Sequence, residues 1–202
     1  MLAGLRAILF DLDGVLIRSE EPWFLAVEEA GRRFRGRPIT RAEFAPTFGQ
    51  GTAADLAAFA LRCTAAELDQ FYLEAFPRYA EKVWVSPAAA PVLDALRDRG
   101  LAVAVVTNTV APLTKIVLDA AGLAARLDAV VCASEVPRAK PAPDVVLAAM
   151  ARLGVAAAAT WMVGDSRFDR DAAAAAGVRF IGLGLDGDAR IEDLGELLVL
   201  VP

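Results

Sequence analysis

The sequence has 202 residues, of which 56% are hydrophobic and 23% are charged, and its formal net charge is −5. This length and composition predict a globular domain with a large core, alone or with a small insert, and exclude a disordered chain. The negative charge argues against a nucleic-acid partner, and the absence of histidine excludes Ser-His triads, histidine acid–base pairs and histidine zinc sites.

The first predicted element is a strand at residues 7–10, which is followed at once by Asp11-Leu12-Asp13-Gly14. Four apolar residues without alternation are typical of a strand buried on both faces. If the chain stays extended, the side chains of Asp11 and Asp13 point the same way. Two carboxylates that close raise one pKa unless a cation lies between them. The pair therefore indicates a metal, a proton or a chemical purpose.

Residues 17–84 contain no convincing strand. Helices are predicted from apolar periodicity and from two Thr-x-x-Glu pairs with capping-box spacing: over 21–35, over 52–62, and starting at Thr40 (with Glu43) and Thr64 (with Glu67). We therefore expect an all-helical insert, a cap at residues 17–84, between the two parts of a core formed by residues 1–16 and 85–202.

From residue 86 onward, short apolar runs alternate with helical segments. The predicted strands are 101–106, 129–133, 160–163 and 178–181, and the predicted helices are 88–99, 111–121, 144–153 and 169–176. Strands that alternate with helices at this spacing predict βαβ units and a parallel sheet, which the strand at 7–10 joins. The expected fold class is α/β. The C-terminal LGELLVLVP is interpreted as a packing helix and a final strand.

Polar residues follow four of these strands, at the edge of a parallel sheet where ligands bind. They are Asp11 and Asp13 after the first strand, Thr107 and Asn108 after 101–106, Lys140 at the end of the loop after 129–133, and Asp165 and Asp169 after 160–163. Each group alone is more often a turn, a loop or a helix cap. All four at one edge predict a functional site.

These motifs resemble those of the haloacid dehalogenase-like (HAD) phosphohydrolase superfamily, in its phosphoglycolate phosphatase-like form with a helical cap after the first strand. The family's DxDG[TV] motif matches Asp11 to Val15, its Thr or Ser ending the next strand matches Thr107, its Lys matches Lys140 in KPAPD, and its GDxxxD motif matches Gly164 to Asp169. The match covers nearly the whole chain and implies a Rossmann-like parallel sheet core with an inserted helical cap domain.

The resemblance implies a Mg²⁺-dependent phosphatase that hydrolyses a small phosphate monoester, a phosphorylated metabolite, through an aspartyl-phosphate. Asp11 is the expected nucleophile and Asp13 the general acid and base, and the closeness of Asp11 would raise the pKa of Asp13. Lys140 would pair with Asp11 and a phosphate oxygen. Thr107 and Asn108 would donate hydrogen bonds to phosphoryl oxygens, Asn108 through its side chain or its backbone N–H.

The same resemblance implies a Mg²⁺ site built from oxygen ligands. Asp11, the backbone carbonyl of Asp13 and Asp165 would bind the ion. Asp169 would bind it directly, bind it through water, or hold another ligand in place. The ion would lower the repulsion among the acids and between the nucleophile and the phosphate.

The helical insert is interpreted as a lid whose closure excludes water. Substrate choice would lie in the loop Phe48-Gly49-Gln50-Gly51-Thr52, with Gly49 and Gln50 as candidate substrate-binding residues. A plain connection between helices is nearly as good an interpretation of that loop. Trp23, which opens the first cap helix, is interpreted as packing rather than as a platform for substrate.

Several alternatives remain open at this stage. Dehalogenases lack the second acid, which is present here as Asp13, and phosphonoacetaldehyde hydrolases need a cap lysine, for which Lys82 at the far end of the cap is the only candidate. A β-phosphoglucomutase-like sugar phosphomutase is disfavoured because Trp23 stands about where its histidine would be, although the cap arginines (Arg32, Arg33, Arg35) have unknown directions. A non-catalytic HAD-like binding or regulatory protein is less favoured because no motif is broken.

Two further expectations concern the surroundings of the protein. The sequence lacks an apolar run long enough for a membrane span and lacks the pattern of a signal peptide, and its two cysteines are far apart in apolar segments. We expect a cytoplasmic, reduced protein without a membrane partner; the sequence does not distinguish a monomer from an oligomer. The glycines at 182–187 spell G-x-G-x-x-G but lack the helix and the later acid of a dinucleotide site, so we interpret them as a loop.

Overall fold

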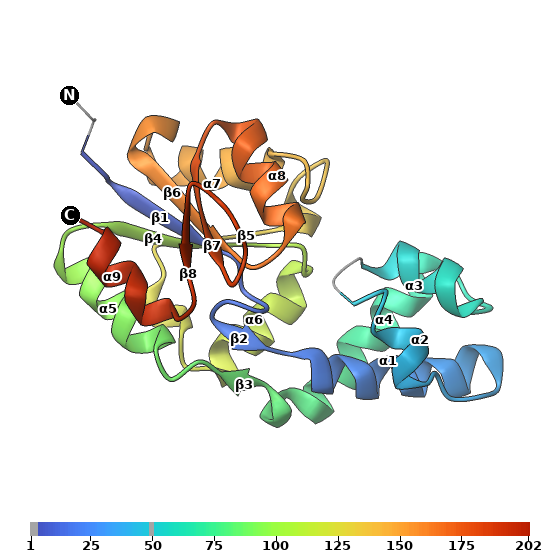
Figure 1. The fold of residues 1–202 in the computed structure, drawn as a ribbon. Helices are drawn as coiled ribbons and strands as arrows, with labels where there is room; N and C mark the ends of the chain where they lie inside the picture. The colour runs from blue at the N-terminus through green and yellow to red at the C-terminus, as the bar shows by residue number, and fades with distance from the viewer. Residues whose placement is uncertain (1–3, 49–50) are drawn as a thin grey trace.

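The structure, a computed structural model, describes residues 4–48 and 51–202, and its centre is one parallel sheet (Figure 1). The sheet has six strands in the order β5-β4-β1-β6-β7-β8, and every neighbouring pair is parallel. The strands are β1 (Ala7–Phe10), β4 (Ala102–Thr107), β5 (Ala129–Cys132), β6 (Thr160–Gly164), β7 (Arg179–Leu183) and β8 (Ala189–Ile191). The predicted α/β fold with a parallel sheet is confirmed.

Helices cover both faces of this sheet, as Figure 1 shows. They are α5 (Ala89–Asp98), α6 (Ala111–Ala120), α7 (Asp144–Leu153), α8 (Arg167–Ala176) and α9 (Leu197–Leu200), with short 3₁₀ turns at η2 (Ala124–Arg126), η3 (Ala133–Glu135), η4 (Ala157–Ala159) and η5 (Leu194–Glu196). The helices α7 and α8 lie on one face, and α5, α6 and α9 lie on the other.

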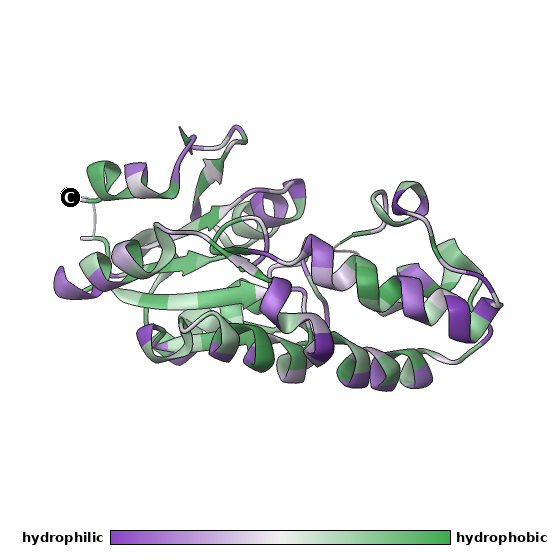
Figure 2. Cartoon of the chain, turned by 90° about the horizontal axis from the view of Figure 1, so that it is seen from below, coloured by the Kyte–Doolittle hydropathy of each residue, from purple (hydrophilic) through white to green (hydrophobic). Residues whose placement is uncertain are grey.

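The middle strands are buried on both faces, which explains why their sequences do not alternate. In β1, Leu9 packs in the cluster formed with α7 and α8, whereas Ile8 and Phe10 pack in the cluster formed with α5 and α6. The strands are hydrophobic along their length in Figure 2. Because β1 lies between β4 and β6, the residues that follow these three strands meet at the same edge of the sheet.

A helical segment follows β1 and extends away from the sheet (Figure 1). It consists of α1 (Glu20–Arg35), α2 (Arg41–Phe44), α3 (Thr52–Phe59), α4 (Ala65–Ala75) and the 3₁₀ helix η1 (Phe76–Lys82). The capping boxes predicted at Thr40 and Thr64 are both formed. Each threonine accepts a hydrogen bond from the N–H of the glutamate three residues on, which fixes where α2 and α4 begin.

Two short strands join this segment to the sheet, and the sequence did not predict them. Ile17–Arg18 (β2) pairs antiparallel with Trp84–Val85 (β3), and Ser86 donates a backbone hydrogen bond to Leu16. The strands are only two residues long, too short for a periodicity signal. They hold the two connections of the helical segment beside each other.

The end of the chain also differs from the prediction. The strand β8 pairs parallel to β7 beyond the loop that holds the G-x-G-x-x-G sequence, and its three residues gave no apolar run to detect. The predicted final strand is wrong, because the last residues form η5, α9 and two residues without regular structure. Within the described residues, no helix combines the length and the apolar composition that a membrane crossing requires.

Candidate active site

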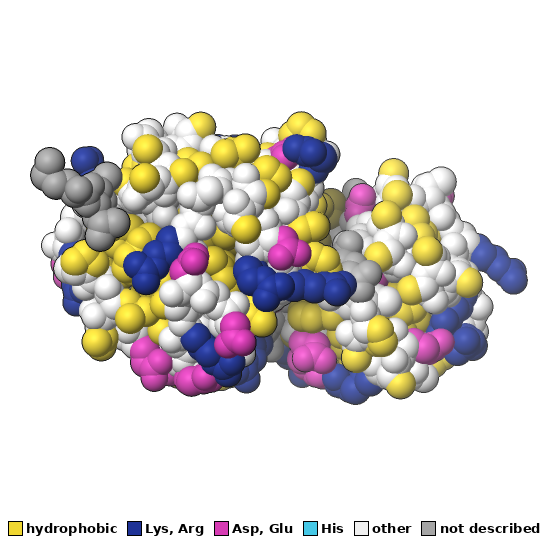
Figure 3. Space-filling view, turned by 45° about the horizontal axis from the view of Figure 1, so that its top comes forward, with side chains coloured by type: hydrophobic (Ala, Val, Ile, Leu, Met, Phe, Trp, Pro, Cys, Tyr) yellow, Lys and Arg dark blue, Asp and Glu magenta, His cyan; other side chains and the backbone are white. Residues whose placement is uncertain are grey.

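The structure brings the sequence motifs together around one cavity of about 260 Å³ at the carboxyl ends of β1, β4 and β6. On the sheet side, the cavity is lined by six of the residues that the sequence singled out: Asp11, Asp13, Thr107, Asn108, Lys140 and Asp165. The seventh, Asp169, lies just behind the wall. Figure 3 shows the narrow waist between the sheet and the helical segment on one side of the molecule.

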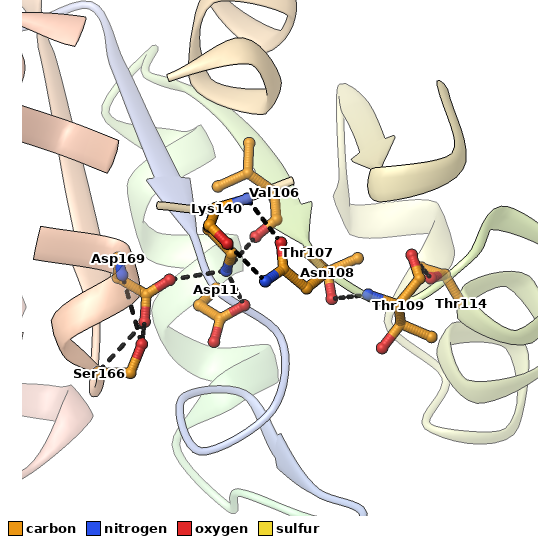
Figure 4. A network of polar contacts seen from close by, with 9 residues as sticks. All are labelled: Asp11, Val106, Thr107, Asn108, Thr109, Thr114, Lys140, Ser166 and Asp169. Carbon is orange, nitrogen blue, oxygen red and sulfur yellow. Dashed lines mark hydrogen bonds and ion pairs between the residues drawn. The ribbon is translucent and has the colours of Figure 1, made fainter. Parts of the chain in front are cut away.

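Lys140 lies at the centre of the polar network in this site (Figure 4). Its Nζ donates to Oδ1 of Asp11 at 2.6 Å, to Oδ1 of Asp169 at 2.6 Å and to the carbonyl oxygen of Val106 at 3.1 Å. The side chain is only 3% exposed. An ammonium group has three protons to donate, so all three are used, and two buried acids share one buried cation.

Asp169 is fully buried and is held from two sides. Its Oδ1 faces Lys140, while its Oδ2 accepts hydrogen bonds from the backbone N–H of Ser166 at 3.1 Å and from Ser166 Oγ at 2.5 Å. Ser166 is the N-cap of α8, and Asp169 stands at the third position of that helix in a capping box. The start of α8 therefore fixes the direction of the Asp169 carboxylate.

Three carboxylates form a compact cluster in this network. One oxygen from each of Asp11, Asp165 and Asp169 lies within 4.8 Å of the others. A glycine makes room for this close approach: Gly14 has φ +86°, and a Cβ there would lie 1.8 Å from Oδ2 of Asp165. A side chain at Gly14 would therefore both strain the backbone and push Asp165 out of the cluster.

The pKa values of the acids in this cluster reflect burial first and excess negative charge second. Burial raises the pKa of Asp11, and the charge of Asp169 raises it further against the opposing effect of Lys140. Desolvation and then Asp169 raise the pKa of Asp165 to about 6. Burial lowers the pKa of Lys140, but Asp11 and Asp169 together outweigh it and leave the pKa above its ordinary value. One ammonium does not balance three carboxylates, so the cluster attracts a further cation.

The acid cluster fits Mg²⁺ by its chemistry. Carboxylate oxygens are the ligands that this hard cation prefers, and a site with few protein ligands leaves positions for water and for phosphate oxygens. Asp11, Asp165 and Asp169 supply such oxygens within one small volume. The residues present therefore suit the implied ion.

Asp13 is held differently from the expectation. The chain bends at Leu12 instead of continuing extended, and Asp13 Oδ1 accepts hydrogen bonds from the backbone N–H and the hydroxyl of Ser19. Burial raises the pKa of Asp13 while Ser19 and Lys140 lower it. The predicted cause, crowding by Asp11, is wrong. The neighbouring acid that raises the pKa of Asp11 most is Asp169, which is remote in sequence.

Thr107 and Asn108 follow β4 and line the cavity. Thr107 is 2% exposed, and its Oγ1 accepts from the N–H of Thr109 at 3.1 Å. The Asn108 side chain is engaged with Lys140: Nδ2 donates to the Lys140 carbonyl at 3.1 Å, and Oδ1 accepts from the Lys140 N–H at 2.9 Å. The side chain of Asn108 therefore positions Lys140, and of its two expected routes to phosphate the backbone N–H is the one that fits.

The helical segment supplies the far wall of the cavity. Part of this wall comes from the loop predicted to choose the substrate, through Phe48, Gly51 and Thr52. The sequence did not single out four further wall residues, which are aromatic or acidic: Phe44, Asp55, Asp69 and Tyr72. The sequence signal that could have found one of them is the four-residue spacing of Asp55 and Phe59, which places both on one side of a helix; these two are the buried residues of α3. An acid on the buried face of a helix requires a reason.

Two further expectations about the helical segment concern the candidate substrate-binding residues and Trp23. Gly49 and Gln50, the candidate substrate-binding residues, lie outside the described residues. Trp23 packs against Phe76 and Tyr72, with ring centroids 4.7 and 5.4 Å away, and it also lines the cavity. It therefore packs as expected and also faces the space where substrate would bind.

Cations expected by two alternative activities are not in the cavity wall. Lys82 ends η1 and is exposed to solvent. Arg32 pairs with Glu28 on the surface, Arg33 lies over the Phe34 ring, and Arg35 binds Glu43 and two carbonyls. Among the described residues that line the cavity, Lys140 is the only lysine or arginine. Within the described residues, the helical part of the wall therefore has no lysine to form a Schiff base and no lysine or arginine to bind a second phosphate.

Comparisons with known proteins agree with this architecture. Residues 5–177 match the haloacid dehalogenase-like hydrolase family. The chain is 30% identical over 181 residues to N-acetylmuramic acid 6-phosphate phosphatase of Pseudomonas aeruginosa, covering 87% of this chain and 80% of that protein. It is 33% identical over 180 residues to a phosphoglycolate phosphatase of Xylella fastidiosa, covering 86% and 77%. A solved HAD phosphatase from Thermococcus onnurineus superposes with a TM-score of 0.74 at 29% identity, over 97% of both chains.

Proposed function

The chain belongs to the haloacid dehalogenase-like hydrolase family, and we propose that it is a Mg²⁺-dependent phosphatase of a small phosphorylated metabolite that works through an aspartyl-phosphate. Its relatives include phosphatases named for phosphate monoesters. The observation that carries the proposal is the position of Asp11: its carboxylate lies in the cavity at the end of the central strand and is held by Lys140 at 2.6 Å.

The proposed reaction has two steps, and both use Asp13 for proton transfer. In the first, an Asp11 carboxylate oxygen bonds to phosphorus, the bond from phosphorus to the leaving oxygen breaks, and Asp13 gives that oxygen a proton. In the second, Asp13 takes a proton from water while the water oxygen bonds to phosphorus and the bond to Asp11 breaks. Burial raises the pKa of Asp13, which supports its starting as the acid.

The remaining residues orient the groups that react. Ser19 holds the Asp13 carboxyl, and Lys140 holds the Asp11 carboxylate. Thr107 and the backbone N–H of Asn108 are proposed to bind phosphoryl oxygens, and Asn108 and Asp169 keep Lys140 in place. Mg²⁺ held by Asp11, the Asp13 carbonyl and Asp165 would supply positive charge against the repulsion between carboxylate and phosphate.

The proposal also covers the domain organisation, the kind of partner and the location of the protein. Residues 17–84 are proposed as a cap over a core of residues 1–16 and 85–202, because their helices supply the wall of the cavity opposite the sheet. Closure of a cap excludes water and completes the pocket. The net charge of −5 supports a small-molecule partner rather than a nucleic acid, and we place the protein in the cytoplasm.

The first experiment measures hydrolysis of para-nitrophenyl phosphate, a generic aryl phosphate, by the purified protein. We expect turnover with Mg²⁺, loss of turnover with a chelator, and recovery when Mg²⁺ is restored. Asp11→Asn keeps the size of the side chain but removes the nucleophilic charge, so it should abolish turnover. Asp186→Asn is the matched control, since that side chain is 89% exposed and pairs with Arg190. Turnover that is retained in Asp11→Asn, or that is unchanged by the chelator, contradicts the proposal.

A further inference from the structure

The wall of the cavity in the helical segment has an unusual charge distribution. It contains two carboxylates, Asp55 on α3 and Asp69 on α4, together with aromatic rings, and no lysine or arginine among its described residues. Some Lys and Arg side chains reach the outer rim of the waist in Figure 3, but among the described residues of the whole cavity wall Lys140 is the only lysine or arginine.

Asp55 is buried at this wall, and one of its two carboxylate oxygens has no hydrogen-bond partner among the described residues. It is 8% exposed, and its Oδ2 accepts a hydrogen bond from the Tyr72 hydroxyl at 2.9 Å. No described residue donates to its Oδ1. The only fully buried side-chain nitrogen or oxygen without a partner, among the described residues, is Nε of Arg35. Asp55 Oδ1 is therefore not fully buried, and since Asp55 lines the cavity, we infer that this oxygen faces it.

Asp69 repeats the arrangement from the neighbouring helix. Its Oδ1 accepts a hydrogen bond from the Thr52 hydroxyl at 2.5 Å, and its second oxygen accepts none from the described residues. Asp69 and Tyr72 are three positions apart on α4, so they lie on the same side of the helix. Two hydroxyl groups of the protein thus fix two carboxylates, each with one acceptor oxygen left for a ligand.

These two carboxylates would act on the leaving group of the substrate. The phosphate would lie at the sheet edge near Asp11 and Lys140, so the leaving group would extend toward Asp55 and Asp69. A carboxylate there would meet like charges, and the described residues of that wall offer it no lysine or arginine, which is a strong means of rejecting a substrate. A hydroxyl or an ammonium group would instead satisfy the two open acceptors. Rings such as Trp23 and Phe44 offer apolar contact for its carbon atoms.

We propose that Asp55 and Asp69 select a leaving group that donates hydrogen bonds and carries no negative charge, such as a sugar, a polyol or an amino alcohol. This inference rests on the proposed phosphatase function and narrows its substrate class. It sets the chain apart from the activity named for one of its relatives, phosphoglycolate phosphatase, because the leaving group of phosphoglycolate bears a carboxylate.

The test compares kcat/KM of the full-length protein with Mg²⁺ for four esters: glucose 6-phosphate, phosphoethanolamine, 2-phosphoglycolate and para-nitrophenyl phosphate. We expect at least one of the two donor esters to exceed 2-phosphoglycolate by about tenfold or more, because like charges in an interface are strongly unfavourable. The first two esters distinguish a hydroxyl donor from an ammonium donor. If 2-phosphoglycolate is cleaved as well as the better donor ester, the inference is wrong.

The variants Asp55→Asn and Asp69→Asn test the residues themselves. Each removes a charge at nearly constant shape, so the preference for the donor ester over 2-phosphoglycolate should fall about fivefold or more. Asp186→Asn should leave that ratio unchanged, and circular dichroism checks that every variant folds. An unchanged ratio in both cap variants overturns the inference. Absence of turnover on all four esters, para-nitrophenyl phosphate included, instead overturns the proposed function.

Discussion

At the level of single residues, Lys140 explains how two acids can be buried beside each other. Its ammonium touches Asp11 and Asp169, which come from β1 and from α8. Breaking a buried ion pair by removing one partner is strongly destabilising because it leaves an unpaired charge. The same contacts hold the Asp11 carboxylate, the proposed nucleophile, in one orientation at the cavity. A single lysine therefore serves both the packing and the proposed chemistry of the site.

Asp55 is a buried acid whose cost to stability can be measured. Its pKa is raised to about 6 by burial, against the hydrogen bond from Tyr72, and the unfolded value is about 3.9. A raised pKa means that the folded state binds the proton more tightly. The stabilisation from this proton is therefore complete below about pH 4 and is lost as pH rises toward 6, and the buried charge costs about 3 kcal/mol at pH 7.5.

Asp55→Asn should remove that cost, since asparagine is neutral and can still accept from Tyr72. We expect the free energy of unfolding at pH 7.5 to rise by up to about 3 kcal/mol. The gain over wild type should grow by about 1 kcal/mol between pH 5 and pH 7.5. Urea unfolding at the two pH values measures both quantities, with Asp186→Asn as the exposed control. A gain that is absent, or that does not depend on pH, contradicts the account of Asp55.

Residue identities at the sheet edge were predictable, but several of their contacts were not. Asp11, Lys140, Asp165 and Asp169 follow strands and carry motif spacings, so position in sequence was enough to select them. The hydrogen bonds of Asn108 to Lys140 and the cause of the raised pKa of Asp13 depend on how loops bend. Loop bending has no periodic signal in the sequence.

At the level of elements, the turn after β1 depends on one glycine. Gly14 has φ +86°, and a Cβ there would lie 1.8 Å from Oδ2 of Asp165. Gly36, at the C-terminus of α1, has φ +80°, but a Cβ at that position would meet no neighbouring atom within 4 Å. A side chain would therefore strain the backbone at both positions, but it would clash with a neighbouring residue only at Gly14.

The pair Gly14→Ala and Gly36→Ala separates strain from the clash. Gly36→Ala should lower the free energy of unfolding by about 1–2 kcal/mol, the cost of a left-handed alanine, with activity retained. Gly14→Ala should lower it further and should also reduce kcat/KM, because Asp165 must move. Urea unfolding and aryl phosphate turnover report the two effects. Equal loss of stability in both variants, with activity intact in both, would show that the turn does not shape the acid cluster.

Elements with strong local signals were predicted well. The capping boxes at Thr40 and Thr64 and the five longer strands have direct sequence signatures in side-chain spacing and apolar runs. Sequence signatures were lacking for β2, β3 and β8, because each strand has three residues or fewer. The absence of a final strand also had no signature. Such short strands form because they pair with a distant segment of the chain, and their own composition does not determine them.

At the scale of the whole molecule, the helical segment and the sheet part share one apolar cluster. That cluster includes Phe24 and Phe76 from the helices as well as Phe10 and Leu113 from the sheet side. The only two covalent connections run through β2 and β3, which pair with each other. The cavity is lined from both parts, with the proposed catalytic residues on the sheet side and the proposed selective residues on the helical side. The family similarity covers both parts.

The central claim is that phosphate passes through Asp11, and one measurement tests it most directly. The protein is mixed with Mg²⁺ and an excess of the best substrate and quenched during turnover with borohydride, which reduces an aspartyl-phosphate to homoserine. Mass spectrometry of the peptide that contains residues 7–18 then locates the modified position. We predict homoserine at residue 11, dependent on substrate and absent in Asp11→Asn. Steady turnover with residue 11 unmodified, or with the modification at another acid, contradicts the account.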